Sequence, residues 1–201
     1  MNIVFIGPQG SGKGTQAKII ADQLSLPHIS TGDLLRNLDG ELKKEADSYM
    51  NSGKLVPDEF IIKILNQRIK RPDCKKGFIL DGFPRNINQA KTLDKSIKIG
   101  KAIEISITDQ EAIKRILSRI SCQKCGIVFN LSTNPPKKEN ICDVCGNPLI
   151  RRKDDTQEAL EKRLETYHKE TKPIIAYYMA TRIDGAQPIE KVTKDILKEL
   201  K

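Results

Sequence analysis

The chain has 201 residues, a length that suits one α/β domain carrying insertions. It contains no run of about 20 apolar residues, so we expect no membrane-spanning helix. Its formal net charge of +9 is compatible with nucleic-acid binding, with lysines spread over solvated helix faces, or with cations gathered around phosphates. Aromatic residues make up only 4% of the chain and Trp is absent, which argues against a surface that stacks on bases.

The first signal along the chain is a glycine-rich turn between a strand and a helix. Residues 7–15 read GPQGSGKGT and follow the apolar run 2–6, and a helical period covers residues 13–24. Glycines leave backbone N–H groups free to close on oxyanions, and a helix N-terminus adds partial positive charge. Lys13 supplies a full charge for the outer phosphates. The pattern predicts a phosphate-binding P-loop rather than an ordinary glycine-rich turn.

One detail of this loop departs from the general P-loop pattern. Gly14 separates Lys13 from Thr15, whereas most P-loops place Ser or Thr directly after Lys, where the hydroxyl touches magnesium. The order Gly-Lys-Gly-Thr resembles the nucleoside monophosphate kinases, and this resemblance implies a metal held mainly by phosphates and water. We therefore do not expect Thr15 to be a direct magnesium ligand.

Strands and helices alternate along the rest of the chain. Short apolar runs bounded by turn residues predict strands at 27–30, 78–80, 102–107 and near Ile183. Helical periods cover residues 58–70, 109–120 and 155–170. We expect residues 180–182 to form a short connection before the last strand. The alternation predicts an α/β fold of the P-loop NTPase kind, with a parallel five-stranded sheet covered by helices on both faces.

Two stretches interrupt the alternation. Residues 31–57 are polar and helical and carry no strand signal. Residues 121–150 are rich in Cys, Pro, Asn and Gly and show little helical period. We interpret both stretches as inserts on the core that the sheet forms.

The segment Asp81-Gly82-Phe83-Pro84-Arg85 follows the third predicted strand. An Asp at the carboxyl end of a strand beside a P-loop is placed to hold magnesium, directly or through water. The alternative is that Asp81 caps the next helix. Arg85 follows a constrained Phe-Pro turn, and its planar guanidinium suits a phosphate dianion.

Further arginines follow the second strand and flank the second insert. Arg36 lies one turn past Asp33 and is placed either to bind phosphate or in an ordinary N-capped helix. Arg115 and Arg119 are four residues apart on the predicted helix, so we expect them to share a face. Arg152 and Arg163 complete this set of arginines, and Asp154 and Asp155 are placed to cap the next helix or to orient the arginines. Exposed arginines usually interact only with solvent, but four of them beside a P-loop indicate charge neutralisation during phosphoryl transfer.

Four of the five cysteines form two Cys-x-x-Cys pairs with 16 residues between them, Cys122 with Cys125 and Cys142 with Cys145. Each pair presents two thiolates from a tight turn, and four soft ligands suit a tetrahedral Zn²⁺. The alternatives are two disulfides or free thiols. Four thiolates close the coordination sphere, so the predicted zinc site is structural. The fifth, Cys74, is expected to be a packed or free thiol.

Taken together, these residues resemble the adenylate kinase family over nearly the whole chain. The matching segments, in order, are 7–15, Ser30 to Arg36, Gly53 to Asp58, Asp81 to Arg85 with Gln89, Arg152 to Asp155, Lys162 to Leu164, and Asp184-Gly185. The resemblance implies three parts: a CORE at 1–30, 58–118 and 156–201, an NMP-binding insert at 31–57, and a LID at 119–155 of the zinc-bearing kind.

The resemblance also implies site residues. ATP would be bound by Gly10, Ser11, Gly12, Lys13, Gly14, Thr15, Arg115, Arg119, Val128, Phe129 and Gln187. AMP would be bound by Thr31, Arg36, Lys54, Leu55, Val56, Gly82, Phe83, Pro84, Arg85, Gln89, Arg152 and Arg163. Catalysis would rest on Lys13, Asp81, Arg85, Arg119, Arg152 and Arg163.

Within this family resemblance, Thr31 and Gln89 favour adenine, because uridylate–cytidylate kinases usually have Ala and Asn at these places. The implied reaction is Mg·ATP + AMP ⇌ 2 ADP, with Mg²⁺ and structural Zn²⁺ as cofactors. The NMP-binding insert looks a few residues short between Asn37 and Met50. The other class considered, a nucleic-acid-binding P-loop or zinc module, would leave the acceptor segments without a purpose.

We expect a monomer that binds ATP, AMP and ADP, and neither nucleic acid nor membrane. A cleavable signal peptide would remove the first strand and the P-loop, so we expect none, and a cytoplasmic protein. Catalysis is expected to need closure of both inserts over the CORE, with hinges at Gly53, 119–121 and 151–155.

Overall fold

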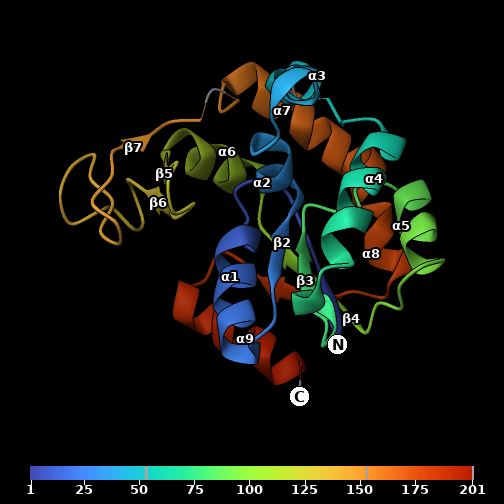
Figure 1. The fold of residues 1–201 in the computed structure, drawn as a ribbon. Helices are drawn as coiled ribbons and strands as arrows, with labels where there is room; N and C mark the ends of the chain where they lie inside the picture. The colour runs from blue at the N-terminus through green and yellow to red at the C-terminus, as the bar shows by residue number, and fades with distance from the viewer. Residues whose placement is uncertain (53, 153, 201) are drawn as a thin grey trace.

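A computed structural model describes residues 1–52, 54–152 and 154–200. Its centre is a parallel five-stranded sheet in the order β2-β3-β1-β4-β8 (Figure 1). The strands are β1 Asn2–Ile6, β2 His28–Ser30, β3 Phe78–Asp81, β4 Lys101–Ser106 and β8 Thr181–Asp184. The α/β fold with five parallel strands, predicted from the alternating pattern, is confirmed.

The central strand β1 is apolar from Ile3 to Ile6 because the sheet is covered on both faces. Ile3, Val4, Phe5 and Ile6 are each at most 2% exposed. Phe5 pairs with Asp81, and Asp81 pairs with Ser30, so β1, β3 and β2 end at one edge of the sheet. The P-loop, the segment that follows β2 and the segment that follows β3 therefore emerge side by side at that edge.

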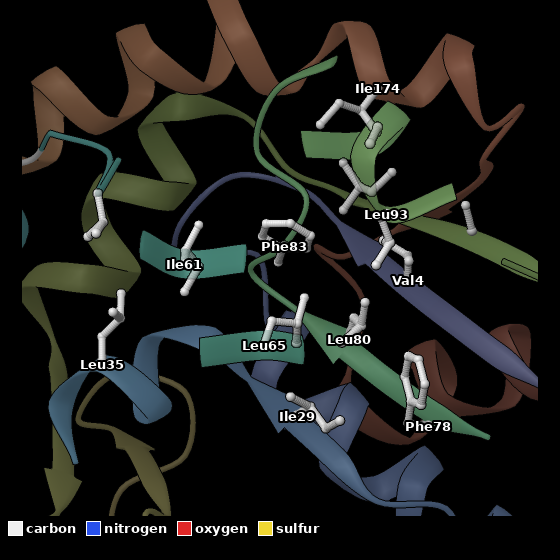
Figure 2. Close-up of a cluster of buried hydrophobic side chains, with 14 of the residues drawn as sticks. Val4, Ile29, Leu35, Ile61, Leu65, Phe78, Leu80, Phe83, Leu93 and Ile174 are labelled. Atoms are coloured by element: carbon white, nitrogen blue, oxygen red, sulfur yellow. The ribbon is translucent and has the colours of Figure 1, made fainter. Parts of the chain in front are cut away.

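Helices cover the two faces of the sheet. On one face α1 Lys13–Leu24 and α9 Ile189–Glu199 pack against β1 and β4. On the other face lies the larger core in Figure 2, where Val4 and Leu80 meet Leu65, Leu93 and Ile174. These last three come from α4 Asp58–Ile69, α5 Ile87–Asp94 and α8 Pro173–Tyr177. Among the helices of the described ranges, none has the length and apolar character to cross a bilayer.

The stretch 31–57 contributes two helices, α2 Thr31–Arg36 and α3 Gly40–Asn51, and no strand in its described residues. Its helical character is confirmed. Ser30 caps α2 by accepting a hydrogen bond from the Asp33 N–H at 3.2 Å. Figure 1 shows α3 beside α7 Gln157–Thr166, which continues as a π-helical turn at Tyr167–Thr171. The predicted hinge Gly53 lies outside the described residues.

The stretch 119–155, which we call the LID, forms its own small sheet at one side of the molecule (Figure 1). Antiparallel strands β5 Arg119–Cys122, β6 Val128–Asn130 and β7 Leu149–Ile150 pair in the order β6-β5-β7. The sequence pattern did not reveal these strands. They are two to four residues long, too short for a period-two signal to stand out.

Two expected boundaries are wrong. The helix expected at 109–120 is α6 Asp109–Leu117, because Arg119 to Ser121 pair with β6 instead. Arg115 and Arg119 therefore do not share a helical face. The expected connection 180–182 is also wrong, because Thr181 and Arg182 already pair with Ile103 and Glu104 of β4.

Candidate nucleotide site and metal centre

The P-loop joins β1 to α1 and depends on glycine at two positions in particular. Gly10 has φ +79°, and a Cβ there would come within 2.8 Å of the Ala112 carbonyl oxygen. Gly12 has φ +93° and immediately precedes α1, and a Cβ there would meet nothing within 4 Å. The space over Gly12 is thus open at a helix N-terminus, where an oxyanion is favoured.

Lys13 folds back over the loop that it follows. Its Nζ donates to the Pro8 carbonyl oxygen at 2.8 Å and lies 3.5 Å from Ser11 Oγ. Desolvation lowers the pKa of Lys13 to about 8, although the Asp81 carboxylate opposes part of this shift. A desolvated ammonium group with so little counter-charge is ready to bind an anion.

Asp81 lies against the start of α1, since a Cβ on Gly14 would sit 3.1 Å from Asp81 Oδ2. Burial alone would raise the pKa of Asp81, but His28, Lys13 and Arg85 outweigh it and hold that pKa below its usual value. The carboxylate is therefore ionised beside the P-loop. The alternative helix-capping role is wrong, because Asn86 caps α5. Magnesium binding by Asp81 stays a prediction.

The turn after β3 forms the neighbouring half of the site. Its Phe83–Pro84 peptide bond is cis, and Phe83 is 2% exposed. Arg85 Nε donates to the Gly82 carbonyl oxygen at 2.7 Å, which fixes the guanidinium next to the strand end. Burial and the nearby Arg163 lower the pKa of Arg85 to about 10. Thr31 Oγ1 donates to the Asp81 carbonyl oxygen at 3.3 Å, which brings α2 to the same edge.

Gln89 lies in the first turn of α5 and is 2% exposed. Its Oε1 accepts the Arg85 backbone N–H at 2.6 Å, and its Nε2 donates to Asp58 Oδ1 at 2.7 Å. Asp58 also accepts hydrogen bonds from Asn86 Nδ2 at 3.0 and 3.3 Å. The sequence pattern by itself assigns no role to Asp58. The available signal was an acidic residue at the start of a helix, directly after Pro57.

Asp154 connects the first insert with α7. It accepts a hydrogen bond from Arg163 Nη2 at 2.7 Å, and Arg36 Nη2 lies 3.5 Å from the same oxygen. Arg163 Nη2 also donates to the Met50 carbonyl oxygen of α3 at 2.8 Å. Burial would raise the pKa of Asp154, but Arg163 and Arg36 outweigh it and lower that pKa to about 2.

Asp155 holds the first strand of the LID. Its Oδ2 accepts a hydrogen bond from Arg119 Nε at 2.9 Å, and its Oδ1 contacts Arg119 Nη2. Since Thr156 caps α7, both Asp154 and Asp155 orient arginines rather than cap the helix. Desolvation, Arg119 and Arg36 together lower the pKa of Arg152 to about 10. The arginines thus gather into a group whose mutual repulsion a polyphosphate would relieve.

The remaining predicted ATP residues are placed unequally. Arg115 Nη1 donates to the Gly185 carbonyl oxygen at 2.9 Å, and a Cβ on Gly185 would come within 3.0 Å of the Ser11 carbonyl oxygen. The loop that holds Gln187 therefore begins against the P-loop. The LID residues differ, because the Phe129 side chain is buried in the small LID core while Val128 is partly exposed.

The predicted AMP residues at the end of the first insert lie in a short segment without regular secondary structure. Lys54 is exposed, Leu55 is half-buried, and Val56 is 8% exposed within the larger core. Lys153, between Arg152 and Asp154, lies outside the described residues.

The four paired cysteines come together in the LID, with all their Sγ atoms within 4.8 Å of one another. Cys122 Sγ lies 3.4 Å from Cys145 Sγ, and Cys125 Sγ lies 3.5 Å from Cys142 Sγ. These distances are too long for disulfides and match thiolates placed about 2.3 Å from a tetrahedral ion.

Each cysteine pair is held by the same turn. Gly126 and Gly146 have φ near +70°, and their N–H groups donate to the carbonyl oxygens of Cys122 and Cys142 at 3.0 and 2.9 Å. These repeated turns and the four thiolate donors fit a tetrahedral metal ion such as Zn²⁺. Four protein donors would leave no open coordination position on such an ion.

Comparison with known proteins agrees with this geometry. The family model described as "Adenylate kinase" matches residues 5–183. The chain belongs to the adenylate kinase family. It is 48% identical to the adenylate kinase of Caldanaerobacter subterraneus subsp. tengcongensis, with all of this chain and 96% of that protein covered. It is 46% identical to the adenylate kinase of Clostridium acetobutylicum, with 98% of this chain and 97% of that protein covered. It is 45% identical to the adenylate kinase of Archaeoglobus fulgidus, with 98% of this chain and 96% of that protein covered.

Proposed function

We propose that this protein, as a member of the adenylate kinase family, catalyses reversible phosphoryl transfer from Mg·ATP to AMP, giving two ADP, and so balances the adenine nucleotides. The observation that carries the proposal is the juxtaposition of Lys13, at the start of α1, and Arg85, in the turn after β3. Both cations are desolvated, and each lies near the Asp81 carboxylate. A donor phosphate over the P-loop and an acceptor phosphate on Arg85 would meet at this edge.

The proposed chemistry needs no general base, because the acceptor phosphate is already an anionic nucleophile. The protein contributes positioning and electrostatic stabilisation of the charge that spreads over the transferred phosphoryl group. Lys13, Arg85 and Arg163 supply cations from the CORE, and Arg119 and Arg152 supply them from the LID. Mg²⁺ arrives with ATP and would neutralise phosphate charge, with Asp81 holding it directly or through water.

We propose that the three parts predicted from the sequence act as separate bodies: the CORE, the NMP-binding insert 31–57 and the LID 119–155. The ATP residues of the P-loop lie on the CORE, whereas Arg119 lies on β5 of the LID. Both reach one phosphate chain only when the LID is down, which also excludes water from the reaction. The AMP residues bridge the insert and the CORE in the same way.

For the LID we propose a structural Zn²⁺ bound by Cys122, Cys125, Cys142 and Cys145. The support is the closed set of four thiolate donors, which leaves no position for substrate or water. Iron binds the same donor set, so elemental analysis is the deciding measurement. The monomeric state, the cytoplasmic location and the lack of nucleic-acid or membrane partners stay predictions.

The direct test is a coupled assay of ADP formation from Mg·ATP with a panel of monophosphates. We expect AMP to be the best acceptor and dAMP the second, with CMP and UMP slower by orders of magnitude. Gln89 and Thr31 motivate this order. Comparable rates with UMP and AMP would rule out an adenylate-specific acceptor site.

Closure is tested by amide hydrogen exchange with a ligand that bridges both nucleotide sites. We expect slower exchange in residues 31–57 and 119–155 together, because both stretches would close on the ligand. Protection of the P-loop alone, with both stretches exchanging freely, would contradict the closure mechanism.

A further inference from the structure

The side-chain amide of Gln89 has two partners of opposite and unambiguous chemistry. The Asp58 carboxylate only accepts hydrogen bonds, and it lies 2.7 Å from Gln89 Nε2. The backbone N–H of Arg85 only donates, and it lies 2.6 Å from Gln89 Oε1. The assignment of nitrogen and oxygen in this amide therefore follows from the partners themselves.

A rotation of the amide by half a turn is opposed at both ends. It would place Oε1 against the Asp58 carboxylate and Nε2 against the Arg85 N–H, which replaces two hydrogen bonds with two repulsive contacts. Gln89 is also 2% exposed, so water has little access to replace the lost partners. Asp58 is itself fixed, because the Asn86 side chain that caps α5 donates to it.

Each amide atom keeps one hydrogen-bonding capacity for a ligand. Oε1 retains a second lone pair, and Nε2 retains a second N–H. Adenine presents an N6–H donor beside the N1 acceptor, whereas a 6-oxopurine presents an O6 acceptor beside an N1–H donor. A fixed amide therefore matches adenine, while a freely rotating amide would serve both bases.

We propose that Asp58 is a specificity-determining positioning residue, which makes the acceptor site select 6-aminopurines over 6-oxopurines by fixing the side-chain amide of Gln89 in one orientation. The inference rests on the proposed function, because it takes Gln89 as the residue that meets the base of AMP. A glutamine amide carries both a donor and an acceptor and could rotate to suit either base. The fixed orientation is the reason why Gln89 would discriminate between 6-aminopurines and 6-oxopurines.

The first test uses the unaltered protein with three monophosphates that differ at position 6. AMP has an amino group there, purine riboside 5′-monophosphate has only hydrogen, and IMP has an oxygen. With a fixed amide, the order of kcat/KM is AMP, then the unsubstituted purine nucleotide, then IMP, because only IMP brings an acceptor against Oε1. An amide free to rotate would bind IMP better than the unsubstituted nucleotide, and that order would overturn the proposal.

The second test is the variant Asp58→Asn, whose amide also donates and so removes one of the two barriers to rotation. We expect the ratio of kcat/KM for AMP to that for IMP to fall roughly 10- to 100-fold, the scale of one charge-assisted hydrogen bond. Most of the change is expected in KM, with kcat for AMP less affected. A purely structural role for Asp58 would lower both rates together and leave the ratio unchanged, which would overturn the proposal.

The matched control is Glu59→Gln, which removes the same charge one residue further along α4. Glu59 is exposed and lies in the same first helical turn. We expect its AMP-to-IMP ratio to equal that of the unaltered protein, and an equal fall in both variants would assign the effect to charge rather than to the amide. An unaltered protein that does not prefer AMP over UMP would refute the proposed function. A protein that does prefer AMP, with a ratio indifferent to Asp58→Asn, would refute only this inference.

Discussion

The edge of the main sheet and the cysteine cluster of the LID place charge in opposite ways. At the sheet edge, Lys13 and Arg85 are desolvated cations whose pKa values fall to about 8 and about 10. In the LID, the four cysteine Sγ atoms lie within 4.8 Å of one another. A bound anion would stabilise the first arrangement, and a metal ion held by the four thiolates would stabilise the second.

The sheet edge and the cysteine cluster also differ in the size of the hydrophobic core beside them. The sheet edge rests on a large core that includes Val4, Leu80 and Phe83 (Figure 2). Among the described residues of the LID, the buried cluster holds only Ile120, Phe129 and Leu149 besides two of the cysteines. A core this small gives little hydrophobic stabilisation, so we expect the LID sheet to depend on a metal ion bound by the four cysteines. The comparison predicts that charge removal at the edge abolishes chemistry, while metal removal in the LID abolishes stability.

The largest effect is expected from Lys13→Ala and Arg85→Ala. Each removes a preorganised charge and is expected to lower kcat by roughly 10²–10⁴-fold, with the fold and zinc content retained. Steady-state assays and circular dichroism measure the two properties separately. Lys18→Ala, on the exposed side of α1, is the control and should behave as the parent. Activity of either site variant within tenfold of the parent would contradict the assignment.

The next effect tests the LID. Replacing Cys122 and Cys142 by Ser is expected to release the metal and lower the thermal midpoint by roughly 10 °C, because metal-binding free energy is folding free energy. Turnover at low temperature should change much less. Cys74→Ser is the control and should retain about one zinc per chain. A double variant that melts like the parent but has lost activity would show that the metal takes part in catalysis.

The depressed pKa of Lys13 gives an intermediate effect on binding. Above about pH 8 free Lys13 loses its proton, so ATP affinity should fall by up to about tenfold per pH unit. The sign for folding is opposite, because the unfolded chain binds more protons between about 8 and 10.5, and this group then stabilises the fold as pH rises. Titration calorimetry at several pH values measures both affinity and proton uptake. Equal pH profiles for the parent and Lys13→Ala would contradict the prediction.

The smallest effect concerns the CORE far from both sites. Met179 follows α8 with φ +48° and is 89% exposed, and the Ala180 N–H donates to the Ile175 carbonyl oxygen at 2.9 Å. This left-handed position suits glycine, so Met179→Gly should raise the free energy of unfolding by about 1 kcal/mol. Urea denaturation measures it, with Met179→Ala as the control that keeps the strain. The metal content should not change, and a loss of stability would show that the exposed side chain contributes.

Much of the candidate site was readable from the sequence because its signals are local. The order strand, glycine turn, Lys13 and helix lies within 23 consecutive residues, Asn2 to Leu24, and the structure has each element where it was expected. The spacing of the cysteines likewise needs only two tight turns, each followed by a glycine that tolerates a left-handed backbone. Such signals survive without knowledge of what packs against them.

The errors came where tertiary pairing overrode a local pattern. The helical period through 109–120 continued past Leu117, but Ile120 becomes buried by pairing in the LID sheet, and this ends the helix. Likewise the sequence pattern predicts a connection at Thr181 and Arg182. Both residues instead belong to β8, because they pair with the neighbouring strand β4. A strand partner more than 70 residues away in the chain is invisible to a local window.

The sequence by itself determined the P-loop, the parallel α/β core, the cysteine donor set and the family resemblance. Only the tertiary structure decided how the polar side chains pair. Asp58 meets Gln89 across 31 residues, and Arg163 meets the Met50 carbonyl oxygen across 113. The physical reason is that hydrogen bonds and ion pairs form between groups within a few ångströms in space, whereas sequence periodicity reports only which face of an element is buried.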